Sequence, residues 1–352
     1  MKRTGSGKQT QIYGLEGMRT LALLGVLLFH MFPRDVKGGY FGVILFFVIS
    51  GFLTALNTVR RQNIPVVTYW KKRFLRIYPA LIVMLFVTVE VIALADRFKL
   101  QNAQEEIASV LFAYNNYWQI SRHADYFANL SANSAFTHLW YIAILIQFEV
   151  VWPLLYRLLK RMRHSTAVLG ILVLVSMLVM PVGSFLPAVS QTQLYYGTLS
   201  RIHALLFGAW LGWKQALAEK RRIKRIKKFP ALLASAVFLL VSIPVYRSAG
   251  GENIAVYRYG MVLYALFSGI MIAILSRTDR KTGVILDNPV CHFFSTYSYE
   301  IYLWQYPVLF AAGLIGMEKQ YVLQIAVLLA LSMWSHALPD FLRSVFARRR
   351  TN

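Results

Sequence analysis

The feature that most constrains this chain is a series of apolar runs, each about as long as a membrane-spanning helix. Such a helix needs about 20 mostly apolar residues. With 57% hydrophobic and 15% charged residues, the chain lacks the polar surface of a soluble protein. We therefore predict an all-α polytopic membrane protein with about ten transmembrane helices, at residues 15–32, 38–56, 79–95, 139–159, 166–186, 199–213, 229–246, 259–275, 289–312 and 321–338.

A shorter apolar run at 107–120 carries Asn115, Asn116 and Gln119 in its middle. It can be an eleventh span, a re-entrant piece or an interfacial helix. If it does not cross and the N-terminus is cytoplasmic, 28 of the 38 Lys and Arg residues lie in inside segments and eight lie outside. If it crosses, 19 of them move outside. The positive-inside rule thus predicts cytoplasmic termini and an extracytoplasmic re-entrant or interfacial segment.

From the sequence we expect no cleavable signal peptide, long linker or repeat. We expect a single integral-membrane domain over 1–352, with cytoplasmic tails at about 1–13 and 341–352 and no attached soluble domain. The net charge of +23 follows from topology and contact with membrane lipids, so no nucleic-acid partner is predicted. One cysteine and scattered histidines give no metal site.

Arg19 and His30 lie eleven residues apart in the first apolar run. At 100° and 1.5 Å per residue, they share a helix face to within about 20° and lie roughly 16 Å apart along the axis. Two interpretations are open. Arg19 can snorkel to phosphates while His30 caps the helix end, or the pair marks a polar track that ends at a histidine able to act as a general base.

Three other features have competing interpretations. Glu149 is an acidic residue within a span, where placing an ionisable side chain costs free energy. It either orients a histidine or forms a salt bridge that fixes helix packing. Arg73 and Arg76 share one face of a predicted amphipathic helix between the second and third spans, where they bind either anionic lipids or a phosphorylated cytosolic ligand. Gly208 and Gly212 form a small-xxx-small pair, which favours close helix packing over a dimer interface.

Taken in order, these motifs resemble the acyltransferase 3 family of bacterial membrane O-acyltransferases, and the membrane part of the peptidoglycan O-acetyltransferases looks closest. An arginine and a histidine with ten residues between them, and two arginines separated by two residues, are that family's signatures. The segments that carry the resemblance are residues 14–19 followed by His30, 38–43, 46–52, and 73–76 followed by Pro79, with weaker matches continuing to about residue 310.

The chain also departs from the family's pattern. The family often has an acid where this chain has Ile44, two glutamates where it has Leu145 and Ile146, and a histidine where it has Gln305. Glu149 is the acid that stays near the glutamine of that motif. Many peptidoglycan O-acetyltransferases also have an extracellular esterase-like domain, and the resemblance therefore implies a separate extracytoplasmic transferase as a partner.

The resemblance implies an acyltransferase of the bacterial cell membrane that moves an acyl group, foremost acetyl, from cytosolic acyl-CoA to a hydroxyl of a surface glycan such as peptidoglycan, or of a lipid-linked sugar. Arg73 and Arg76 would bind the phosphates of acetyl-CoA, and no metal would be needed. Arg19 would stabilise the donor, and His30 would be the base or a transient acyl carrier. Glu149, together with Tyr195 as an outer acyl relay, completes the predicted catalytic set.

His138 borders the acceptor site or merely ends a helix. Two other classes of function fit the same sequence. A transporter or flippase also has many spans with buried polar residues, although the corresponding Gly- or Pro-interrupted pair of helices is not found in the two halves. A catalytically altered partner subunit would keep the fold without the activity.

Overall fold

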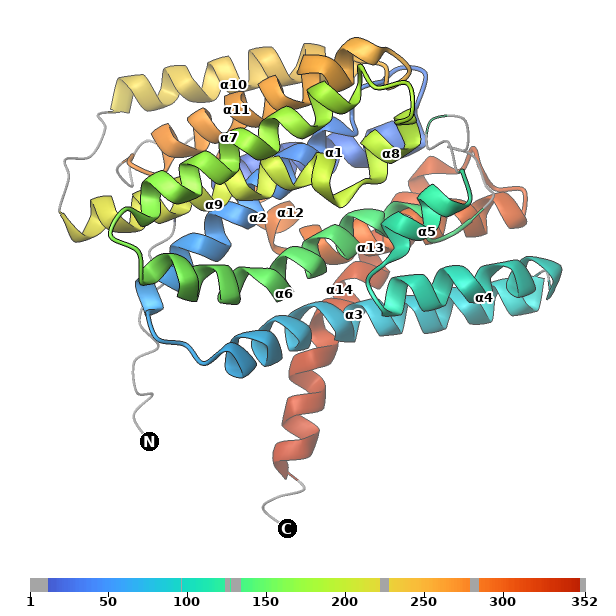
Figure 1. Cartoon of the computed structure of the whole chain (residues 1–352). Helices are drawn as coiled ribbons and strands as arrows, with labels where there is room; N and C mark the ends of the chain where they lie inside the picture. The colour runs from blue at the N-terminus through green and yellow to red at the C-terminus, as the bar shows by residue number, and fades with distance from the viewer. Residues whose placement is uncertain are drawn as a thin grey trace.

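The computed structural model describes residues 12–95, 97–123, 127, 134–221, 228–278 and 285–348, and the regular elements among them are helices. The long helices lie roughly side by side, and the end of α14 projects from the bundle (Figure 1). The elements are α1 (Leu15–Met31), α2 (Phe41–Arg61), α3 (Val66–Ala95), α4 (Arg97–Leu111), α5 (Asn115–Ser121), η1 (Thr137–Leu139), α6 (Trp140–Lys160), α7 (Ser165–Gly183), α8 (Gln191–Tyr196), α9 (Thr198–Lys220), α10 (Lys228–Ser248), η2 (Val256–Gly260), α11 (Met261–Leu275), α12 (Pro289–Thr296), α13 (Ser298–Leu314) and α14 (Tyr321–Arg348).

The all-α polytopic architecture is confirmed. Within the described residues, seven helices are long and apolar enough to cross a membrane: α2, α3, α6 with η1, α7, α10, α11 with η2, and α14. Of the other expected spans, α1 and α13 have 17 residues each, and α9 is less apolar. The total of about ten spans therefore stays a prediction.

Two expected boundaries were wrong. The amphipathic segment and the third span form one helix of 30 residues that continues through Pro79. Proline is tolerated within membrane helices because neighbouring groups satisfy the backbone it frees. The apolar run at 289–312 is two helices, α12 and α13, which meet at Tyr297. Both differences concern the half of the bundle where α1, α3 and α13 begin.

The run at 107–120 is divided between α4 and α5, and Ala113 adopts a positive φ of 56° between them. Side-chain hydrogen bonds attach α5 to the bundle. Asn116 Nδ2 donates to the carbonyl oxygen of Tyr196 at 3.0 Å, and Gln147 Nε2 donates to Asn116 Oδ1 at 2.9 Å. Asn116 thus joins α5 to α6 and α8, and the interfacial or re-entrant placement of this segment stays a prediction.

The tightest helix contact joins α2 and α9 through glycines. A Cβ atom at Gly208 would lie 2.1 Å from the carbonyl oxygen of Val48, and one at Gly212 would lie 2.2 Å from that of Phe52. Gly51 of α2 faces Leu205 of α9 equally closely. The interpretation of Gly208 and Gly212 as a close-packing pair is confirmed, because only hydrogen fits where these backbones meet.

We expect Gly208→Ala to lower stability by about 1–3 kcal/mol, because the added methyl group must push α2 and α9 apart. Gly313→Ala is the matched control, since a Cβ there meets nothing within 4 Å. Thermal unfolding of the detergent-solubilised protein checks both variants. Equal melting temperatures for the two would contradict this account of the α2–α9 contact.

Candidate active site

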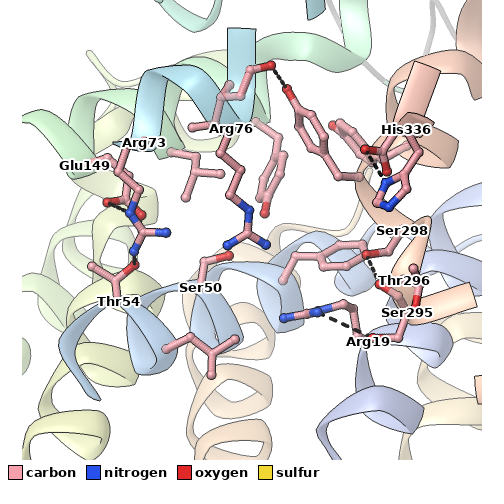
Figure 2. Close-up of a pocket in the computed structure, with 18 of the residues that line it drawn as sticks. Arg19, Ser50, Thr54, Arg73, Arg76, Glu149, Ser295, Thr296, Ser298 and His336 are labelled. Carbon is pink, nitrogen blue, oxygen red and sulfur yellow. Dashed lines mark hydrogen bonds and ion pairs between the residues drawn. The ribbon is translucent and has the colours of Figure 1, made fainter. Parts of the chain in front are cut away.

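A cavity of about 670 Å³ lies in the half of the bundle where α1, α3 and α13 begin. Figure 2 shows Arg19 and Arg76 reaching into it from α1 and α3. Its walls come from seven helices, so the site exists only in the folded chain. The lining residues are Glu16, Arg19, Phe46, Ser50, Leu53, Thr54, Lys72, Arg73, Leu75, Arg76, Ile77, Tyr141, Leu145, Glu149, Ser295, Thr296, Ser298, Tyr299, Glu300, Tyr302 and His336.

The start of α1 is fixed in a way that aims Arg19 at the cavity. Both carboxylate oxygens of Asp287 accept from the backbone N–H of Gly14, at 2.9 and 2.8 Å. At Gly17, a Cβ would lie 2.4 Å from the carbonyl oxygen of Leu286, so glycine lets the two segments touch. Arg19 Nη1 then lies 3.4 Å from Ser295 Oγ of α12. The guanidinium is thus held against α12 on the cavity wall.

Arg73 is committed to an ion pair inside the protein. Its Nε lies 2.9 Å from Glu149 Oε2, and its Nη2 donates to Thr54 Oγ1 at 2.7 Å. Thr54 Oγ1 lies 2.8 Å from Glu149 Oε1, and the hydroxyl of Tyr69 also donates to this carboxylate. Glu149 therefore pairs with Arg73, and within the described residues its ion pair is with this arginine and not with a histidine. Its salt-bridge interpretation is the one that the contacts support.

Arg76 differs from Arg73 although both lie on the same face of α3. It is exposed to the cavity, and it forms no hydrogen bond or ion pair with any residue that the structure describes. Figure 2 shows its guanidinium pointing toward Ser50, while Arg73 turns to Glu149. An arginine without an acid partner offers all its donors to a ligand, and planar guanidinium groups suit phosphate oxygens.

The cavity wall carries more basic than acidic side chains: Arg19, Lys72, Arg73 and Arg76 against Glu16, Glu149 and Glu300. Glu149 pairs with Arg73, Glu16 Oε1 lies 3.2 Å from His292 Nδ1, and Glu300 Oε1 lies 3.0 Å from His336 Nδ1. These contacts leave Arg19, Arg76 and Lys72 as the cavity cations without an ion-pair partner among the described residues. The cavity therefore favours an anionic ligand.

We expect Glu149→Gln to lower the free energy of unfolding by about 3 kcal/mol, because it leaves Arg73 as a poorly compensated charge within the protein. The matched control is Glu219→Gln, which breaks the Arg60–Glu219 pair on the surface and costs less than about 1 kcal/mol. Melting temperatures in the same detergent compare the two. A loss in Glu149→Gln no larger than in the control would refute a structural role for the buried pair.

His30 lies at the other end of α1, among aromatic rings. It is 7% exposed, and its ring centroid lies 5.0 Å from that of Tyr306 in an edge-to-face contact. The side chain of Gln305 lies beside it. Arg19 faces α12 and His30 faces α13, which follows α12 directly, so the two residues lie on the same side of α1. His30 is not among the residues that line the cavity.

The cavity is bounded toward His30 by Tyr302. This side chain lines the cavity and its ring lies 5.2 Å from that of Tyr141 and 5.4 Å from that of His138. Its hydroxyl also donates to the backbone carbonyl of His138. Tyr302 therefore connects the cavity wall with the histidines behind it, a role that its place in an apolar run did not reveal.

Tyr195 occupies a separate aromatic cluster. It is 2% exposed, its ring lies 4.4 Å from the Arg201 guanidinium carbon and 5.0 Å from the Trp140 ring, and it is absent from the cavity wall. Ring contacts run from Tyr195 through Tyr40 and Phe29 to His30. The structure thus does not bring Tyr195 into direct contact with Arg19, Arg73 or Arg76.

The sequence matches the acyltransferase domain family over residues 12–337. It is 31% identical to the provisionally named peptidoglycan O-acetyltransferase YrhL of Bacillus subtilis, over 85% of this chain and 48% of that protein.

Identity to the peptidoglycan O-acetyltransferase OatA of Listeria monocytogenes is 28%, over 88% of this chain and 51% of that protein. For the O-acetyltransferase OatA of Staphylococcus aureus it is 27%, over 91% and 55%. The chain therefore spans about half the length of these curated relatives. No protein of solved structure matches it.

Proposed function

This chain belongs to the acyltransferase domain family, and on that premise we propose that it is a membrane O-acyltransferase that takes acetyl groups from cytosolic acetyl-CoA. The acceptor is a hydroxyl of a surface glycan such as peptidoglycan, the polymer that the names of the Bacillus and Listeria relatives specify. The single observation that carries the donor assignment is the cavity whose wall presents Arg19 and Arg76, neither of which forms an ion pair with a described residue.

The chemistry of the cavity suits a CoA thioester. The donor carries several phosphate charges, which the guanidinium groups of Arg76 and Arg19 can bind through charge-assisted hydrogen bonds. Hydroxyl groups of Ser295, Thr296 and Ser298 on the facing wall offer further polar contacts. Arg73 holds the start of α3 to α6 and so keeps Arg76 in place. Its role is thus to position Arg76, whereas the sequence predicted that Arg73 itself binds the phosphates of the donor.

The orientation of the chain in the membrane follows from the distribution of its basic residues. The cavity lies at the end of the bundle where α2 ends in Arg60 and Arg61 and α6 ends in Arg157 and Lys160. Basic residues concentrate on the cytoplasmic side of plasma-membrane proteins. The cavity then faces the cytosol, both termini are cytoplasmic, and His30 lies nearer the outer face.

The transfer step requires a base on the acceptor side. Acyl transfer to a hydroxyl needs removal of the hydroxyl proton, and histidine is the side chain most often used for it. His30 lies roughly 16 Å beyond Arg19 along α1, behind the wall formed by Tyr302 and Tyr141. The acyl end of the donor passes this wall to reach His30, which acts as the base or as a transient carrier.

The test uses purified protein in proteoliposomes, acetyl-labelled acetyl-CoA and soluble cell-wall glycan fragments. Release of free CoA thiol together with label on the glycan supports the proposal, and protein-free vesicles give the background. Movement of a glycan or lipid-linked sugar without thiol release would support a transporter instead. Neither thiol release nor label would support a partner subunit and overturn the proposed activity.

A further inference from the structure

A second buried histidine lies beside His30. His138 belongs to η1, just before α6, and is 1% exposed. Its ring stacks on that of Tyr306, with centroids 5.3 Å apart and planes 17° apart. His30 contacts the same phenol edge-on at 5.0 Å. Two imidazoles from α1 and η1 therefore meet around one tyrosine of α13.

The hydrogen bonding of His138 fixes its tautomer. Nε2 lies 3.1 Å from the backbone carbonyl oxygen of Leu303. A carbonyl oxygen only accepts, so Nε2 carries the proton and Nδ1 keeps a lone pair. Within the described part of the chain, Nδ1 has no hydrogen-bond partner. A buried acceptor left unpaired costs about 1–3 kcal/mol, a cost that a ligand hydroxyl would offset.

The surroundings place His138 next to the donor cavity. The hydroxyl of Tyr302 donates to the His138 backbone, and the two rings lie 5.4 Å apart. Tyr302 itself lines the cavity. One tyrosine thus separates the proposed donor site from a neutral imidazole with an available lone pair, which is the state that a general base must have before it takes a proton.

We propose that His138 is a second catalytic histidine, and that its Nδ1 takes the proton of the acceptor hydroxyl during acyl transfer. This inference rests on the proposed function. His30 is then the transient acyl carrier: its imidazole nitrogen takes the acyl group from the thioester, and CoA leaves as free thiol with the imidazole proton. The acceptor oxygen next forms a C–O bond to this acyl carbon while its proton moves to Nδ1 of His138, the bond from the acyl carbon to the His30 nitrogen breaks, and His138 returns the proton to that imidazole.

The decisive variant is His138→Gln, because the glutamine amide can still donate to the Leu303 carbonyl but offers no basic nitrogen. His203→Asn is the matched control. His203 is also 1% exposed, donates through Nδ1 to the Ser200 carbonyl at 2.7 Å, and has an unpaired Nε2 within the described residues. It lies on α9 beside Arg201, so it shares the burial of His138 but not its neighbours.

We expect His138→Gln to slow label transfer to glycan by ~10²–10⁴-fold, the usual contribution of a general base. Acetyl-CoA affinity and melting temperature should match those of His203→Asn. The double variant His30→Ala/His138→Gln should be little slower than the slower single variant, because residues that act as a unit are not additive.

Transfer by His138→Gln at the rate of His203→Asn would overturn this inference while leaving the proposed function intact. Parallel loss of donor affinity or of melting temperature in His138→Gln would also overturn it, since that pattern means a structural role. A wild-type protein that neither binds acetyl-CoA nor transfers label overturns the proposed function, and the role of His138 with it.

Discussion

Replacing His30 with alanine is expected to abolish most acyl transfer while the protein stays folded and inserted. The expected loss is at least ~10²–10⁴-fold in the rate of label transfer from acetyl-CoA to glycan, the range that general-base catalysis contributes, because transfer loses its base or its transient acyl carrier. Donor affinity should change little, since His30 does not line the cavity where Arg19 and Arg76 lie. Transfer rate and donor affinity are measured on the same proteoliposome preparation.

A second variant separates chemistry from packing at His30. His30→Gln keeps a polar side chain of similar bulk against Tyr306 and Phe29, so its melting temperature should stay near that of the wild type. Both variants should lose transfer to a similar extent. Normal transfer by either one would remove His30 from the mechanism, whatever its effect on stability.

The periodicity of one helix was enough to predict the relation between Arg19 and His30. Residues eleven positions apart on an α-helix return to nearly the same face, and the structure turns Arg19 to α12 and His30 to α13. The apolar runs likewise predicted the positions of most long helices, because burial of the backbone in lipid leaves a helix as the only stable form of such a run.

Contacts between distant segments could not be predicted in the same way. Arg73 and Arg76 look equivalent along α3, yet Glu149 of α6 pairs with Arg73 and leaves Arg76 in the cavity. The pair Glu300–His336 joins α13 to α14 across 36 positions. Only the packing of the helices decides which acid meets which base, and one sequence gives no measure of that packing.

The sequence also did not predict that one helix continues through a proline or that one apolar run is divided at a tyrosine. Pro79 lies within α3, and the last residue of α12 and the first of α13 flank Tyr297. The consequence reaches the site, because Ser295, Ser298 and Tyr302 come to the cavity from these two helices. A single helix through 289–312 would have presented a different set of side chains.

Arg76→Gln is expected to weaken acetyl-CoA binding by roughly tenfold to a hundredfold. A hydrogen bond to a charged group contributes about 1.5–3 kcal/mol, and each 1.4 kcal/mol is a factor of ten in the dissociation constant. Arg76 has no acid partner in the described residues, so its loss should leave the melting temperature near that of the wild type. Equilibrium binding of labelled acetyl-CoA measures the change.

Arg60→Gln and Arg73→Gln complete the comparison. Arg60 pairs with Glu219 outside the cavity, so its replacement should leave donor affinity unchanged. Arg73→Gln breaks the pair with Glu149 and should reduce stability more than Arg76→Gln does, since it leaves a buried carboxylate uncompensated. If Arg76→Gln binds acetyl-CoA as tightly as Arg60→Gln, the cavity is not the phosphate site. Arg73 and Arg76, one helical turn apart, would then differ only in how much each contributes to the stability of the protein. The donor would have to bind elsewhere.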